Sequence, residues 1–229
     1  MKELLQKNLT IVRERVADAC LKSGRTLSDI SIVAVTKYLN VAQIASLLEV
    51  GLYDLGENRV QELVRKSEAL SPEIRWHMIG HLQRNKARKA CEKSVLIHSI
   101  DSERLLEAVS AAGESLGRTI DVLIEINVSG EDTKQGASPS DLKALVERAM
   151  QLTHVNPIGL MTMAPIVSDP EDARPYFSAL RELASTIRES FSLDGFRELS
   201  MGMSGDYEAA VKEGATILRI GSALYEGIL

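Results

Sequence analysis

The sequence alternates between short apolar runs and amphipathic stretches, and this alternation limits the possible folds more than any other feature. Eight runs have the length and composition of buried strands, at residues 31–36, 53–56, 75–79, 95–99, 120–128, 156–163, 196–201 and 216–220. Each is followed by a stretch with helical spacing. Strands that alternate with helices pair in parallel, because each helix returns the chain to the same edge of the sheet. Eight such units in 229 residues predict a closed (β/α)8 TIM barrel.

An extra helix is expected before the first strand, over residues 1–23, where apolar residues recur on one helical face. Ser138 is the expected N-cap of the helix before the sixth strand, and a last helix is expected to begin at residues 222–226. We expect residues 1–229 to form a single domain. An open doubly-wound sheet is the alternative, but no Gly-x-Gly-x-x-Gly motif follows the first strand to support it.

Composition and charge exclude several classes of protein. The net charge is −5, and the one basic cluster, residues 84–89, is interpreted as a solvated helix face, so we expect no nucleic-acid partner. Charged residues run through the N-terminus and no apolar run approaches ~18 residues, so neither a signal peptide nor a membrane segment is expected. The two cysteines lack metal-ligand spacing, and we expect no metal site. A cytoplasmic location follows as the prediction.

Lys37 ends the first predicted strand and is the first candidate for function. If its stem is buried among apolar residues, burial favours the neutral amine, which is a nucleophile that condenses with aldehydes. The plainer alternative is a lysine that ends a strand and points to water, as most lysines do.

The loops after the seventh and eighth strands supply the second candidate. Residues 200–206 and 219–222 each combine a strand end, a glycine and a small hydroxyl residue before an expected helix. Glycines and helix N-termini of this kind bind phosphate, and in barrels phosphate sites commonly follow strands seven and eight. Ser204 and Ser222 could each cap a helix or donate to a phosphate oxygen. Strand one lies beside strand eight in a closed barrel, so an amine and an anion site together suggest pyridoxal 5′-phosphate (PLP), which carries an aldehyde and a phosphate.

Seven segments, spread in order along nearly the whole barrel, also resemble one known family: Val33–Lys37, Gly56–Glu62, Trp76–Lys86, Asn127–Glu131, Gly159–Ala164, Ser200–Ser204 and Arg219–Ser222. In these segments the chain is similar to the pyridoxal phosphate homeostasis protein family, the single-domain relatives of the alanine racemase N-terminal barrel. The resemblance implies a protein that takes part in intracellular PLP (vitamin B6) homeostasis without an established turnover reaction.

The resemblance also implies roles for individual residues. Lys37 would form the Schiff base with PLP, and Asn58 would contact the ring. Arg219 would meet the pyridine nitrogen or lie beside the phosphate, a choice that the motif leaves open. The remaining implied contacts are to the phosphate, and they come from Ser200, Ser204, Gly221 and Ser222.

Two enzymatic alternatives remain open. The first is a weak PLP-dependent amino-acid racemase, although an arginine at the ring nitrogen makes a poor electron sink and we expect no second domain to bring an opposing base. The second is a barrel enzyme that uses Lys37 on a phosphorylated sugar or acid. Tyr38 and Tyr225 are interpreted as packing or rim residues, and His98 as an ordinary strand-end residue. The expected partners are PLP and, as candidates, PLP-accepting apo-enzymes; the expected state is a monomer.

Overall fold

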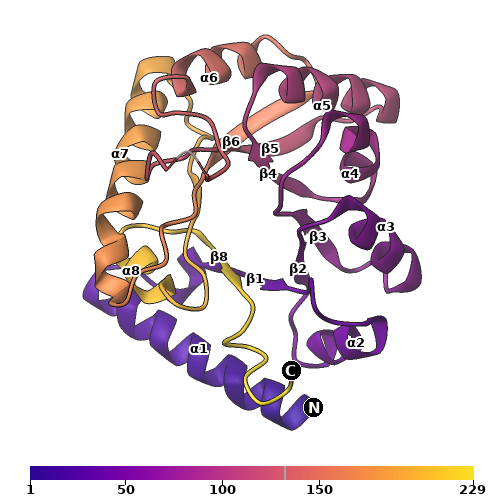
Figure 1. The fold of residues 1–229 in the computed structure, drawn as a ribbon, viewed down its shortest axis with the longest axis vertical. Helices are drawn as coiled ribbons and strands as arrows, with labels where there is room; N and C mark the ends of the chain where they lie inside the picture. The colour runs from indigo at the N-terminus through magenta and orange to yellow at the C-terminus, as the bar shows by residue number, and fades with distance from the viewer. Residues whose placement is uncertain (132) are drawn as a thin grey trace.

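The computed structural model describes residues 1–131 and 133–229, and its centre is a closed barrel of parallel strands in the order β1 to β8 (Figure 1). The strands are β1 Ser31–Val35, β2 Asp54–Glu57, β3 Arg75–Met78, β4 Leu96–Ile100, β5 Ile120–Glu125, β6 Val155–Met161, β7 Glu198–Ser200 and β8 Ile217–Ile220. β1 pairs with β8, with Val33 opposite Arg219. The predicted (β/α)8 barrel is confirmed, and its closure places the end of strand one beside strand eight.

The α-helices surround the barrel (Figure 1). They are α1 Lys2–Lys22, α2 Val41–Glu49, α3 Val60–Ala69, α4 Ala87–Lys93, α5 Glu103–Leu116, α6 Leu142–Met150, α7 Arg174–Phe191 and α8 Tyr207–Lys212. Short 3-10 turns complete the description: η1 Leu27–Asp29, η2 Arg84–Lys86 and η3 Pro170–Ala173. Among the residues described, no helix has the length and apolar character needed to cross a membrane.

The N-terminal helix α1 closes the ring of helices. It packs against both α8 and α2. It therefore occupies the position that a helix after β8 would otherwise take. The expected last helix at 222–226 is wrong, because residues 222–228 form consecutive turns. The side chain of Asn8 in α1 donates to the carbonyl oxygens of Leu224 and Glu226, each at 3.0 Å, so α1 holds the C-terminal segment in this non-helical form.

The start of α6 also differs from the prediction. The helix begins at Leu142, three residues after the expected first turn. The Ser138 hydroxyl donates to the Asp141 carboxylate at 2.7 Å instead of accepting a backbone N–H as an N-cap would.

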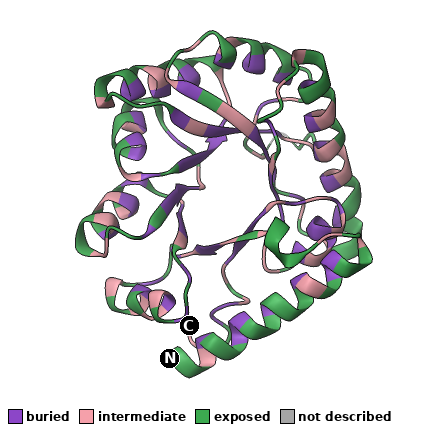
Figure 2. Ribbon diagram, turned by 180° about the vertical axis from the view of Figure 1, so that it is seen from behind, coloured by how far each residue is buried: buried purple, intermediate pink, exposed green. Residues whose placement is uncertain are grey.

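The barrel interior has an apolar layer below a polar one. Side chains of a strand alternate between its two faces. The apolar layer is a cluster separate from the main core and contains Val33, Leu96, Leu123, Met161 and Ile217. Two residues further along their strands stand polar residues that are also buried, namely His98, Glu125 and Arg219. The main core fills the space between the sheet and the helices, whose buried sides face the strands and whose outer sides are exposed (Figure 2).

A buried ion pair supports the end of β1. Lys66 of α3 is fully buried, and its ammonium donates to the Glu57 carboxylate at 2.6 Å and to the Thr36 carbonyl at 2.8 Å. The Thr36 hydroxyl donates to the same Glu57 oxygen at 2.6 Å. Thr36 directly precedes Lys37, so this cluster fixes the backbone from which the candidate amine extends.

We expect Lys66→Met to lower the free energy of unfolding by about 3–5 kcal/mol, because it leaves the Glu57 carboxylate buried without its cation. Urea denaturation followed by circular dichroism measures this. The double variant Lys66→Met/Glu57→Gln serves as control and should recover part of the loss, because no buried charge remains. Equal stability of the single variant and the wild type would contradict the assignment.

Candidate functional site

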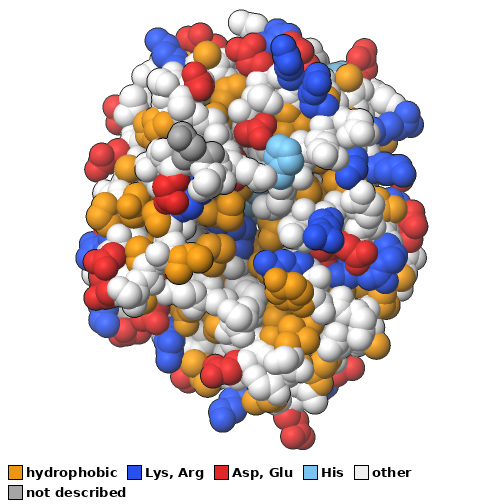
Figure 3. Space-filling view, in the orientation of Figure 1, with side chains coloured by type: hydrophobic (Ala, Val, Ile, Leu, Met, Phe, Trp, Pro, Cys, Tyr) orange, Lys and Arg blue, Asp and Glu red, His pale blue; other side chains and the backbone are white. Residues whose placement is uncertain are grey.

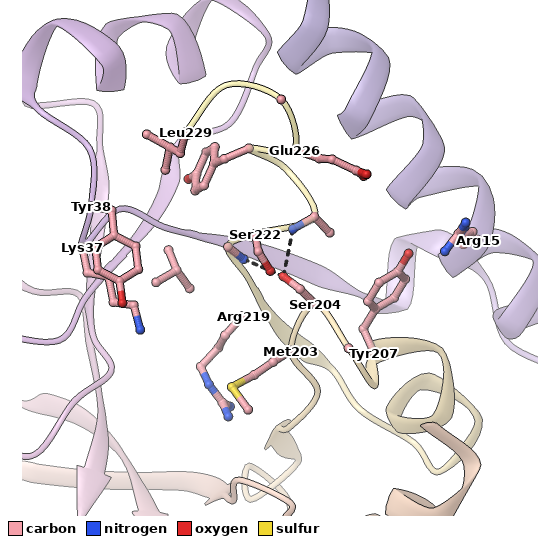
Figure 4. A pocket seen from close by; sticks show the side chains of 16 residues that line it. Arg15, Lys37, Tyr38, Met203, Ser204, Tyr207, Arg219, Ser222, Glu226 and Leu229 are labelled. Atoms are coloured by element: carbon pink, nitrogen blue, oxygen red, sulfur yellow. Dashed lines mark hydrogen bonds between the residues drawn. The ribbon is translucent and has the colours of Figure 1, made fainter. Parts of the chain in front are cut away.

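A cavity of about 890 Å³ opens at the carboxyl ends of the strands, beside β1 and β8. Five of the predicted site residues line it: Lys37, Ser204, Arg219, Gly221 and Ser222. The C-terminal segment, which includes Tyr225, forms a further wall. Figure 4 shows Leu229 of this segment above the cavity and Arg15 of α1 at one side. Figure 3 shows the same end of the barrel hollowed near its centre, with basic side chains in and around the hollow. The cavity therefore lies where the chain order of β1, β7 and β8 predicts a barrel's binding site.

Lys37 lines this cavity from the end of β1, but the premise that its stem is buried is wrong. The residue is exposed, because β1 ends at Val35 and Lys37 lies in the turn that follows the strand. Its amine lies 4.9 Å from the centre of the Tyr38 ring. Figure 4 shows the Lys37 amine and the Arg219 guanidinium directed toward the same space. The lysine is thus accessible to a ligand.

The loops after β7 and β8 are joined through Ser204. Its hydroxyl oxygen accepts hydrogen bonds from the backbone N–H groups of Gly221 and Ala223, each at 3.1 Å (Figure 4). Ser204 caps no helix: the N-cap of α8 is Asp206, whose carboxylate accepts from the Met203 N–H at 2.6 Å. No helix follows β8, so the Gly221 and Ala223 N–H groups belong to turns. The Ser204 hydroxyl oxygen accepts from both of them. Backbone N–H groups converging in this manner bind anionic oxygens.

Gly202 and Gly221, one from each loop, are glycines for different reasons. Gly202 has φ +92°, and a Cβ there would lie 2.6 Å from the Cβ of Ala210 in α8, so backbone and packing both require it. At Gly221 a Cβ would meet only the Cβ of Val35, at 3.6 Å. Packing therefore leaves room at Gly221, and a side chain there would occupy space in the cavity wall.

Arg219 crosses from β8 toward the middle of the barrel. Its guanidinium donates to the Ser200 hydroxyl at 2.6 Å and to the Thr162 carbonyl at 2.9 Å. Burial lowers the pKa of Arg219 to about 10, while Glu125 and Asp206 act in the opposite direction. Arg219 therefore remains a cation at neutral pH and can only donate hydrogen bonds.

The other two predicted residues, Ser200 and Asn58, are not among the described residues that line the cavity. Ser200 is fully buried and lies between Arg219 and His98, whose Nδ1 is 2.8 Å from the serine oxygen. Asn58 is half-buried after β2, where its backbone packs closely against Gly80. The structure thus brings Lys37, Ser204, Arg219, Gly221 and Ser222 together around one cavity. Ser200 lies outside the cavity lining, where it is hydrogen-bonded to Arg219.

Sequence reasoning missed Glu125, a nearly buried carboxyl at the end of β5. Burial raises its pKa to about 7, with Arg219 lowering it and Asp101 raising it further. The sequence carried a signal for this residue, because Glu125 is the last residue of an apolar strand, much as Lys37 follows the end of β1. The interpretation of His98 as an ordinary strand-end residue is wrong, since it bonds to the predicted site residue Ser200.

Tyr225 was interpreted as a packing or rim residue, and the structure gives it a more specific place. It is buried in the C-terminal segment and lines the cavity. Its hydroxyl and the Oε2 atom of Glu57 are both buried without a hydrogen-bond partner among the described residues. Burial raises the pKa of Tyr225, and the Glu57 carboxylate raises it further.

Comparison with known proteins agrees with this geometry. A family model described as the alanine racemase N-terminal domain matches residues 8–228. The chain is 42% identical to the pyridoxal phosphate homeostasis protein of Aquifex aeolicus over 220 residues, which cover 96% of each chain. The structure of PipY from Synechococcus elongatus with PLP bound superposes with a TM-score of 0.81 at 35% identity, covering 93% of this chain and 99% of that one. The crystal structure of an unknown protein from Bifidobacterium adolescentis superposes with a TM-score of 0.91 at 34% identity, covering 97% of this chain and 95% of that one.

The fold and the matched family model define the class as a barrel of the alanine racemase N-terminal type. Within that class, the curated relatives match nearly from end to end. The chain belongs to the pyridoxal phosphate homeostasis protein family.

We expect Glu125→Gln to stabilise the protein at high pH. The folded protein holds a proton on Glu125 up to about pH 7, whereas the unfolded chain releases it near 4.5. The contribution of Glu125 to stability is therefore fully present below about pH 4.5 and is lost progressively as the pH rises to about 7. Glutamine avoids this loss, so the free energy of unfolding should exceed that of the wild type by up to about 3 kcal/mol at pH 8 and by little at pH 4.5.

Urea denaturation at a series of pH values measures this difference. Glu92→Gln is the matched control, because it makes the same substitution at a carboxyl whose side chain is 49% exposed instead of buried. A difference between Glu125→Gln and the wild type that did not vary with pH would refute the assignment.

Proposed function

We propose that this protein binds pyridoxal 5′-phosphate through Lys37 and acts in intracellular PLP homeostasis. The observation that carries the proposal is that the Lys37 amine, the Ser204–Gly221 corner and the Arg219 guanidinium all face one cavity. The aldehyde of PLP matches the Lys37 amine, its phosphate matches the Ser204–Gly221 corner, and its aromatic ring matches the Arg219 guanidinium. The PLP that PipY carries in its bound structure, on the same fold at 35% identity, supports the proposal.

Different residues would bind different parts of PLP. Lys37 is the amine that would attach to the aldehyde carbon, and its exposure leaves it open to an incoming ligand. Ser204 and Ser222 would hold the phosphate through their hydroxyls, and Gly221 would do so through its backbone N–H, in place of its hydrogen bond to Ser204. Ser200 and Asn58 remain predictions as contacts, and Ser200 would act from behind Arg219.

Arg219 supports a binding role over turnover. When bound, PLP supplies an aromatic ring that withdraws electrons most strongly once its nitrogen is protonated. A buried arginine that can only donate would keep a facing ring nitrogen unprotonated. Arg219 would thus hold the ring while weakening its use as an electron sink.

We propose a cytoplasmic, monomeric protein with one barrel domain over residues 1–229, and PLP-accepting apo-enzymes as recipients. Gel filtration with light scattering tests the monomer. Transfer of PLP to an apo-enzyme, measured by its recovered activity, tests the recipients.

We expect purified wild-type protein incubated with PLP to show a visible absorbance band that Lys37→Ala lacks. Borohydride reduction should fix the cofactor on Lys37 of the wild type, as peptide mass spectrometry reads out. Lys134→Ala is the control, since Lys134 is another lysine of this chain and is engaged with Glu131 at 3.1 Å. A reduced adduct on other lysines, with none on Lys37, would sink the proposal.

The racemase alternative has its own test. Wild-type protein loaded with PLP is incubated with L-amino acids in deuterium oxide, and label at Cα is followed by mass spectrometry. The binding role predicts no incorporation at the rate of a working enzyme, and incorporation at such a rate would replace it with a racemase.

We expect Gly221→Ala to weaken PLP binding about tenfold, a loss of about 1.4 kcal/mol, while the protein folds normally. The new methyl group finds room beside Val35 but takes up space against the cavity. Fluorescence titration with PLP measures affinity. Gly195→Ala is the matched control, because its Cβ would likewise meet no crowding and Gly195 does not line the cavity. Equal affinity of both variants would place the phosphate elsewhere.

A further inference from the structure

A second cavity, of about 810 Å³, opens at the same end of the barrel as the Lys37 cavity but in a different sector of its rim. Its described lining comes from residues 81–85 after β3, residues 101–105 after β4 and Gly136 after β5. The Lys37 cavity instead follows β1, β7 and β8, and in the closed barrel β1 and β8 lie across from β5 and β4. Small-molecule pockets commonly have volumes of roughly 300–1,000 Å³, so this second cavity has the size of a ligand site.

The basic cluster at residues 84–89, interpreted from the sequence as a solvated helix face, contributes to this cavity. Arg88 and Lys89 are exposed on α4, as that interpretation expects. Arg84, however, lies in the 3-10 turn η2, which packs against α5. This packing brings Arg84 to the same cavity as Arg104, which lies in the first turn of α5. The cluster is thus a solvated helix face only in part.

Arg84 and Arg104 carry positive charge that no described carboxylate balances at ion-pair distance. The acidic residues three positions before and after Arg104 along the chain are Asp101 and Glu107. Such residues would be the natural partners of a helical arginine. Glu107 pairs instead with Arg148 of α6, at 2.7 Å. The guanidinium of Arg104 is therefore open to a ligand.

Asp101 is also engaged elsewhere, although it lines the cavity. Its Oδ1 atom accepts from the Ser102 hydroxyl at 3.0 Å, and its Oδ2 atom lies 3.5 Å from Nδ1 of His81. Ser102 is the N-cap residue of α5, but its side chain makes no capping hydrogen bond to the helix. The backbone N–H groups of Glu103 and Arg104 therefore have no hydrogen-bond partner among the described residues.

The position of Arg104 is unfavourable for the helix on its own. A helix N-terminus carries partial positive charge, so a cation in the first turn is disfavoured there and an anion is favoured. The acidic residue of the same turn, Glu103, is exposed and is not among the described residues that line the cavity. Departures from such local rules are expected mainly at functional sites. An anion in the cavity would neutralise both guanidiniums and the helix end.

We propose that this cavity is a second anion site, which binds a small phosphate monoester between Arg84, Arg104 and the start of α5. Arginine pairs with phosphate oxygens through two parallel N–H bonds, and uncapped N–H groups at a helix N-terminus bind phosphate as well. A phosphate monoester carries about −1.5 to −2 charge at pH 7, which matches two guanidiniums better than one carboxylate does. The described lining contains no lysine, so the site binds its ligand without a Schiff base and goes beyond the function proposed for Lys37.

NMR of the full chain labelled with ¹⁵N tests this site by titration with glycerol 3-phosphate in a buffer free of phosphate. Glycerol 3-phosphate is a phosphate monoester without an aldehyde, so it does not react with Lys37. We expect saturable shifts of the backbone amide signals of Glu103 and Arg104. The amide of Gly221 reports separately on the first cavity. Glu103 and Arg104 amides that do not shift overturn the proposal, whatever the Gly221 amide does.

The double variant Arg84→Gln/Arg104→Gln removes both cations at exposed positions. We expect the affinity read from the amides at the start of α5 to fall by about tenfold or more, because charged hydrogen bonds to the phosphate are lost. Arg88→Gln/Lys89→Gln is the matched control, since it removes two exposed cations of α4 that are not among the described residues lining the cavity. Equal affinity of the two double variants overturns the proposal.

Two further probes define the chemistry of the ligand. Malonate carries two carboxylates without a phosphate, and a hexapeptide of glutamate stands for an acidic protein segment. We expect each to bind about tenfold more weakly than glycerol 3-phosphate at the α5 amides. Malonate binding as tightly as the phosphate ester would overturn the phosphate assignment, and tighter binding of the peptide would replace it with a protein-docking site. Lys37→Ala should leave the α5 shifts unchanged, so failure of the PLP function and failure of this site give different results.

Discussion

The pairing of β1 with β8 is the constraint on which the rest of the site depends. These strands lie almost two hundred residues apart, and their backbone hydrogen bonds close the barrel. Closure brings the Lys37 turn beside the loop of Gly221, and the neighbouring β7 brings Ser204 across to the same corner. An open sheet with the same strands would leave the amine and the anion corner at opposite edges.

The interior of the barrel shows how a polar site can be built inside a folded core. The apolar layer carries the packing, and the polar layer above it is hydrogen-bonded across the barrel. A buried polar group is costly only when it lacks a partner. Arg219, Ser200 and His98 satisfy one another, so the core tolerates them, while the groups at the mouth remain accessible to a ligand.

The termini contribute more to the site than their positions in the chain indicate. α1 takes the place of a helix after β8, and Asn8 holds the C-terminal segment by two hydrogen bonds. That segment forms a wall of the cavity. Because α1 fills the helical position, the residues after β8 are released to shape the pocket with turns, which explains why the expected last helix does not form.

The sequence by itself determined the barrel and the strand order, because these follow from local periodicity. Strand ends and loop residues gave the candidates Lys37, Ser204, Gly221 and Ser222, and the family resemblance added Arg219. Only the tertiary structure decided that Lys37 is exposed, that Ser204 bonds backbone N–H groups instead of capping a helix, and that His77 and His98 connect to Ser200. The physical reason is that periodicity depends on near neighbours in the chain, whereas burial and hydrogen-bond partners depend on residues that become neighbours only when the barrel closes.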